Sequence, residues 1–173
     1  EMLLSVISEN YLKELSGMIL TLFNSRNDDV VIEVINTLIR FKDKRGNRYV
    51  KKILARDNVS PELICVSLKS IGVLGNFYDF LTVQRFLEHS NPKIQISAIT
   101  AYSRLLGVFS IPKMAHVFDI SNTKVKLEIL SRLGKINHKK SVKLLTHYLL
   151  EDFSGDLALH VEWALHDIDN KFK

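Results

Sequence analysis

Apolar residues recur along this 173-residue chain with a period of about 31, and this repeat restricts its fold more than any other feature. The pattern starts at Asp28, Pro61, Pro92 and Thr123. Apolar side chains lie four, seven and ten residues beyond each start, so they share one face of a helix. The triplets are Ile32, Ile35, Leu38; Cys65, Leu68, Ile71; Ile96, Ile99, Tyr102; and Leu127, Leu130, Leu133. Each start therefore predicts a helix with a buried face.

The residues before these starts suit helix N-caps. Ser60 and Asn91 each precede a proline, which favours the first helical position, while Asn27 and Asn122 are suitable caps without proline. The pattern therefore places four helix boundaries.

A second helix is expected after each first helix, behind a turn that glycine or asparagine marks. The turns are Gly46-Asn47, Gly75-Asn76, Gly107 and Asn137. The apolar triplets beyond them are spaced by 33, 31 and 31 residues. They are Val50, Ile53, Leu54; Val83, Phe86, Leu87; Met114, Val117, Phe118; and Leu145, Tyr148, Leu149. Each repeat is thus predicted to be a pair of antiparallel helices.

Both ends of the chain extend the pattern. Ile19, Leu22 and Phe23 form an earlier copy, Leu4 and Ile7 match the end of its first helix, and a helix over 154–168 keeps Ala158, Val161 and Ala164 in register. We expect one domain over 1–173, divided into a partial repeat (1–26), four full repeats (27–59, 60–90, 91–121, 122–152) and a C-terminal capping helix (153–173). Because Glu1 is not an initiator methionine, the chain is expected to be a fragment of a longer protein.

One such pair cannot bury its apolar faces alone, so neighbouring pairs must stack into a continuous core. The pattern resembles the HEAT repeat family, in the short HEAT-like form of phycobilisome lyases, through its capped Asp, Asn or Pro starts and the endings Ile71-Gly72 and Leu133-Gly134. Isoleucine and leucine replace the family's usual alanine in the first helices. The resemblance implies an all-α fold, an alpha-alpha superhelix of the HEAT-like or armadillo type, with second helices lining the concave side of a right-handed solenoid.

In that family, exposed positions of the second helices bind the partner. With Val50 at zero and about 100° per residue, Lys52 lies at about 200° and points away from the core. Arg85, His116 and His147 are its equivalents in later repeats. The candidate partner-binding residues are Arg48, Lys52, Tyr78, Leu81, Arg85, His116, Lys140, Lys143 and His147.

The charge distribution favours an anionic partner. The formal net charge is +5, but residues 40–56 carry eight Lys or Arg against one Asp and residues 121–150 carry seven against one Glu, whereas 151–173 is net −4. A protein with an acidic surface is the expected partner, and nucleic acid is the alternative. Protonation of His116 and His147 below about pH 6.5 is expected to strengthen either interaction.

The sequence contains no residue pattern typical of a catalytic or metal site. The six histidines show no pair at metal-ligand spacing with a third ligand nearby. The iron-binding His-Glu pairs of the HEAT-like deoxyhypusine hydroxylases are missing, and Glu88-His89 has the reverse order. Cys65 takes the position of a core aliphatic residue. The sequence therefore predicts no enzyme, no cofactor and no metal.

The HEAT-like alkylpurine DNA glycosylases offer a second resemblance, through Trp163 and Asp167, four residues apart. Trp163 is the single tryptophan and lies on the final helix, so a contact with the cap or a partner is the preferred interpretation. The single cysteine favours a reducing, cytoplasmic location, and no apolar stretch of about 20 residues predicts membrane insertion of this segment. A soluble arm of a larger membrane-anchored protein remains the alternative location.

Overall fold

The computed structural model describes residues 17–150 and 155–169. All regular structure within these ranges is helical, which confirms the all-α prediction. The chain divides after Gly75 into two compact units. Leu4 and Ile7, with most of the predicted partial repeat, lie outside the described residues.

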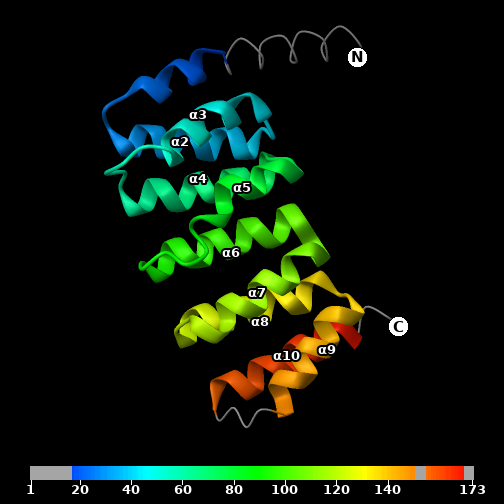
Figure 1. Cartoon of the computed structure of the whole chain (residues 1–173). Helices are drawn as coiled ribbons and strands as arrows, with labels where there is room; N and C mark the ends of the chain where they lie inside the picture. Colours follow the sequence, from blue (N-terminus) through cyan, green and yellow to red (C-terminus); the bar gives the residue numbers. More distant parts are fainter. Residues whose placement is uncertain (1–16, 151–154, 170–173) are drawn as a thin grey trace, which may run out of the picture. The chain divides into compact units, whose positions relative to one another are not determined.

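The described part of the first unit contains two complete first helices and one complete second helix, and residues 17–21 before them are also helical. It comprises η1 (Leu22–Asn24), α2 (Asp28–Arg40), η2 (Lys44–Gly46), α3 (Asn47–Leu54) and α4 (Pro61–Leu74). Both α2 and α3 pack against α4, and η1 packs against α2 (Figure 1). Val50, Ile53 and Leu54 of α3 are buried, as the periodicity predicts.

The second unit continues the alternation of first and second helices. It comprises η3 (Phe77–Asp79), α5 (Phe80–Gln84), α6 (Pro92–Leu106), η4 (Gly107–Ser110), α7 (Ile111–Ile120), α8 (Thr123–Ile136), α9 (Lys139–Leu150) and α10 (Asp156–Asp169). Helix α8 packs between α6 and α10, and α9 packs against both α8 and α10. First helices therefore neighbour first helices within this unit (Figure 1).

All four first helices begin at the predicted residue. The side chains of Asn27, Asn91 and Asn122 accept backbone N–H groups at 2.9, 2.9 and 3.1 Å, which satisfies donors that a helix start leaves unpaired. Ser60 acts differently, because its hydroxyl donates to the Asp28 carboxylate at 2.5 Å instead of capping α4. The predicted turns also hold: Gly107 and Asn137 end α6 and α8 with φ of 51° and 50°.

Two residues predicted to be buried are exposed. Leu149 is 40% exposed. Phe118, at the same position one repeat earlier, is covered by Tyr148 of the next second helix, α9. The described part of the chain has no second helix after α9, so nothing equivalent covers Leu149. Leu22 is 47% exposed because it lies in a 3-10 helix, whose tighter winding turns it away from the buried Phe23.

The first residue of every first-helix triplet is half-buried, so the predicted buried face of these helices is rotated relative to the observed one. In α2 the buried residues are Val31, Val34, Ile35 and Leu38, and Ile32 lies at the edge of that stripe. Cys65 takes the position of these aliphatic residues in α4, as predicted, and like them it is half-buried at the edge of the core. Phe86 and Leu87 are buried as predicted, although α5 ends at Gln84 and they lie in the turn beyond it.

Within residues 17–150 and 155–169, one helical run is long and apolar enough to cross a membrane by length and composition. It covers Pro92–Ile120, and 56% of its most apolar window is buried inside the protein. Gly107 interrupts it with a positive φ between α6 and α7, so the run is not one straight helix. Its hydropathy therefore follows from its place in the core.

Candidate functional site

All nine candidate partner-binding residues have exposed side chains. Arg48 and Lys52 belong to the first unit, and the other seven belong to the second. The predicted row from Lys52 to His147 would extend over both units, so its continuity stays a prediction.

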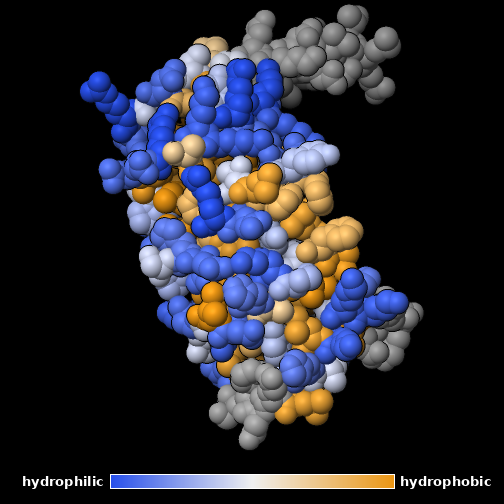
Figure 2. Space-filling view, viewed as in Figure 1, coloured by the Kyte–Doolittle hydropathy of each residue, from blue (hydrophilic) through white to orange (hydrophobic). Residues whose placement is uncertain are grey.

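The second unit exposes a group of large apolar side chains at the start of its second helices. Phe77, Tyr78, Leu81 and Phe109 are 50, 77, 66 and 74% exposed, and we call them the apolar patch. Figure 2 shows apolar surface where α6 leads into α7. The residues predicted from the sequence did not include Phe109, although it lies 31 residues after Tyr78 and 31 before Lys140 and therefore shares their position in the repeat.

Local contacts hold the patch in place. The Asn76 side chain accepts from the Tyr78 N–H at 3.0 Å, and the Asn76 N–H donates to the buried Asp79 carboxylate at 2.8 Å, which forms a capping box. The Phe77 ring contacts the Tyr78 and Phe80 rings edge-on at centroid distances of 5.8 and 5.6 Å. Phe80 in turn contacts Tyr102 of α6 at 6.3 Å. Phe77 and Tyr78 of the patch are thus held in place by packed neighbours.

An acidic residue interrupts the predicted basic face. The Glu88 carboxylate accepts from Lys113 Nζ at 2.6 Å and lies 3.7 Å from His116 Nε2. The hydrogen bond from Lys113 and its charge, with a smaller effect of His116, hold the pKa of Glu88 below its ordinary value. Because Glu88 already faces His116, the predicted gain of anion binding on protonation of His116 is offset locally.

In the first unit, Arg45 and Arg48 of the basic segment 40–56 each contact an acidic or aromatic neighbour. The Arg48 guanidinium lies 4.7 Å from the Tyr49 ring centroid, and that ring stacks on Phe23 at 4.9 Å. Arg45 donates from Nε and Nη2 to Asp43 at 3.0 and 2.8 Å, and this hydrogen bonding raises the pKa of Arg45. Figure 2 shows the hydrophilic surface of this unit.

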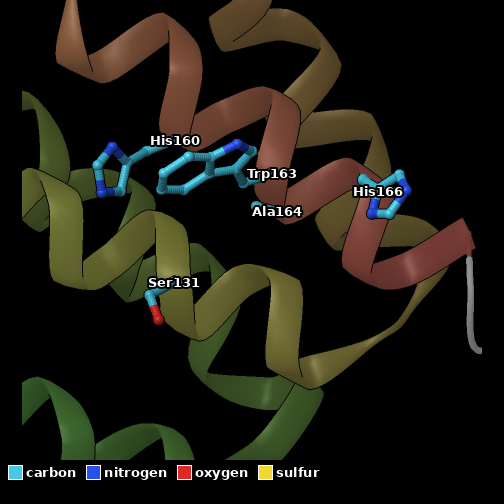
Figure 3. Close-up of a pocket in the computed structure, with 5 residues that line it drawn as sticks. All are labelled: Ser131, His160, Trp163, Ala164 and His166. Carbon is cyan, nitrogen blue, oxygen red and sulfur yellow. The ribbon is translucent and has the colours of Figure 1, made fainter.

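A hollow of about 300 Å³ lies between α8 and α10, where Figure 3 shows His160 and Trp163 side by side on α10 and Ser131 on α8. The His160 and Trp163 ring centroids are 5.2 Å apart, and Trp163 is 58% exposed. Trp163 is therefore not packed into the core. The side chain of Asp167, its partner in the glycosylase resemblance, lies outside the described residues.

A second hollow of about 370 Å³ lies where α6 and α8 end, and we call it the α6–α8 hollow. It carries basic side chains from both helices and from the turn after α8. Its lining residues are Ser103, Arg104, Gly107, Val108, Arg132, Lys135, Ile136 and His138.

Among residues 17–150 and 155–169, no group of three or more His, Cys, Asp or Glu side chains has the geometry to hold a metal ion. No protein-family model matches the chain, and no curated protein matches it. Function is therefore inferred from the chain's own surfaces.

Proposed function

We propose that the chain is a HEAT-like helical-repeat module, an alpha-alpha superhelix that binds another protein without chemistry of its own. Helix starts spaced by 33, 31 and 31 residues and the packing of α8 between α6 and α10 support the repeat architecture. The binding surface would lie on the second helices, whose candidate residues are exposed.

The apolar patch carries this proposal. Four large apolar side chains, each at least half exposed, lie on packed elements of one unit, and such patches mark interaction sites on folded proteins. Two of them are aromatic residues at equivalent repeat positions, and aromatic side chains supply much of the binding energy at interfaces.

Charge indicates the partner's character. The same unit exposes Arg85, Lys140 and Lys143 on the α5 and α9 parts of the candidate surface. A partner segment with an apolar anchor flanked by Asp or Glu would match both the patch and these cations. We therefore propose an acidic segment of another protein as the occupant.

Selection from a random library of displayed peptides tests this proposal. The expected result is enrichment of peptides with an apolar anchor beside acidic residues, and loss of their binding to a Tyr78→Ser, Phe109→Ser double variant. The control variant Ile120→Ser changes an apolar residue of α7 that is 58% exposed and outside the patch, and it should retain binding. Enrichment without acidic residues, or equal binding to the patch variant, would overturn the proposal.

Nucleic-acid binding is the second candidate function, and one observation favours it. Residues 40–56 carry a net charge of +7, and Arg48 and Lys52 are exposed there. Phosphate contacts release counterions, so binding of duplex or single-stranded DNA would weaken steeply with added salt. Micromolar retardation of random-sequence DNA that is lost in a Lys52→Glu, Arg85→Glu variant would reverse our ranking.

A further inference from the structure

The α6–α8 hollow gathers cations without an acidic side chain in its lining. Arg104 and Lys135 stand in the last turns of α6 and α8, lie 31 residues apart and are both exposed. The axes of α6 and α8 lie about 8–10 Å apart where the helices pack, and both residues line the same hollow. In the described part of the chain neither residue forms an ion pair.

Arg132 adds a third, partly buried cation. Its Nε donates to Glu128, which also accepts from the Thr100 hydroxyl at 2.8 Å. The Arg132 side chain is only 16% exposed, and its two terminal nitrogens have no hydrogen-bond partner within residues 17–150 and 155–169. Glu128 therefore orients the guanidinium while leaving donors for a ligand.

His138 adds a fourth hydrogen-bonding side chain to the lining. Its Nδ1 accepts the Lys140 N–H at 3.1 Å, so in the neutral imidazole the proton sits on Nε2. The lining of the hollow thus combines donors from Arg104, Arg132, Lys135 and His138 with the aliphatic side chains of Val108 and Ile136.

Helix stability alone does not account for this arrangement. Cations in a last turn stabilise a helix by about 0.3–1 kcal/mol, which explains Arg104 and Lys135 one at a time. The i,i+4 pair with Glu128 likewise accounts for Arg132 as a helix-stabilising residue. Neither effect explains why the side chains of Arg104, Arg132, Lys135 and His138 line one hollow whose lining has no acidic residue.

From these observations we infer that the α6–α8 hollow binds a phosphate monoester. Guanidinium groups match phosphate oxygens in a two-pronged geometry, and a dianion balances Arg104 and Lys135. A hollow of about 370 Å³ exceeds the size of a phosphate group and leaves room for its organic part against Val108 and Ile136. The lining of the hollow shares no residue with the apolar patch, although Val108 directly precedes Phe109, and the inference does not depend on protein binding at the patch.

The test is an NMR titration of the full chain, observing the backbone amides of Gly107, Val108 and Ile136. Glucose 6-phosphate represents a free metabolite, and a capped Ala-phosphoserine-Ala peptide represents a modified protein. Saturable shifts with either probe support the inference, and the tighter probe identifies the source of the phosphate. N-acetylaspartate is the carboxylate control, and equal affinity for it would overturn the phosphate assignment, as would the absence of saturable shifts with both phosphates.

Matched variants separate the hollow from general electrostatics. Arg104→Gln with Lys135→Gln should weaken binding roughly tenfold or more, because a hydrogen bond to a charged group contributes about 1.5–3 kcal/mol. Lys93→Gln with Lys124→Gln removes the same charge from the opposite ends of the same helices, again at exposed positions 31 residues apart, and should change binding by at most about twofold. Equal weakening in both double variants would overturn the inference.

Discussion

Gly134 of α8 lies against the backbone of Ala164 in α10. A Cβ atom at Gly134 would lie 3.1 Å from both the Cα and the Cβ of Ala164, closer than ordinary van der Waals contact. A Gly134→Val variant should therefore lower the free energy of unfolding by roughly 1–3 kcal/mol, since these two helices cannot separate without losing their packing. Urea unfolding measures the effect.

Lys135→Val is the matched control for this prediction. It places the same side chain at the next, exposed position of α8, where the lower helix propensity of valine and the loss of a cation from the last turn should together cost about 1 kcal/mol or less. An equal loss of stability in both variants would show that propensity, not the approach of α10, determines the effect.

Local signals predicted the helix boundaries because their causes are local. Asn122 caps α8 by accepting the N–H of Val125, three residues away, and Gly107 and Asn137 end helices through their own backbone angles. Such causes involve residues within about one helical turn of the boundary. Because the same local pattern recurs with the repeat period, it predicted four helix pairs.

Contacts between distant residues could not be predicted in the same way. Glu88 meets Lys113 across 25 residues, so its charge was not subtracted from the predicted basic face. The exposure of Leu149 depends on which element covers α9, and periodicity within that helix does not encode its neighbours. Phe109, by contrast, was accessible to sequence reasoning, because the spacing of 31 from Tyr78 identifies it.

The Asn122 cap gives a second prediction. Replacing Asn122 by alanine should destabilise the protein by about 1 kcal/mol, because the Val125 N–H loses its acceptor at the start of α8. Asn122→Ser should restore most of this loss, since the serine hydroxyl accepts the same bond. Thermal unfolding monitored by circular dichroism compares the three proteins, and equal stability of the alanine and serine variants would contradict the assignment.

The apolar patch should be dispensable for folding. Tyr78 and Phe109 are 77 and 74% exposed, so their replacement by serine should change the free energy of unfolding by no more than about 0.5 kcal/mol for each residue. Phe118 is the buried counterpart at 1% exposure, and it stacks on Tyr148 at 4.1 Å. Phe118→Ala should cost roughly 3–5 kcal/mol. Comparable losses in the patch and core variants would show that the patch is structural.

The contribution of the Lys113–Glu88 pair to stability should be lost at acid pH. Lys113→Met removes the main cause of the lowered pKa of Glu88, so that pKa should rise toward its ordinary value of 4.5 in a carboxyl NMR titration. Since the folded-state pKa is lowered, the pair adds stability above about pH 4.5, and this contribution disappears as pH falls through the folded-state value. The difference in stability between wild type and Glu88→Gln should therefore vanish in acid, and a difference that persists there would have another cause.

Tyr102 has a raised pKa, so its contribution to stability should be lost at alkaline pH. Burial raises its pKa above the ordinary value of 10.0, with the charge of Lys113 acting in the other direction. The neutral phenol is thus favoured in the folded state, so its contribution is complete below about pH 10 and is lost as pH rises through the folded-state pKa. Urea unfolding of wild type between pH 8 and pH 11 should show a slope from this residue of at most about 1.4 kcal/mol per pH unit. Tyr102→Phe should remove that slope, because phenylalanine keeps the ring against Phe80 without an ionisable hydroxyl. An unchanged alkaline slope in the variant would assign the effect to another group.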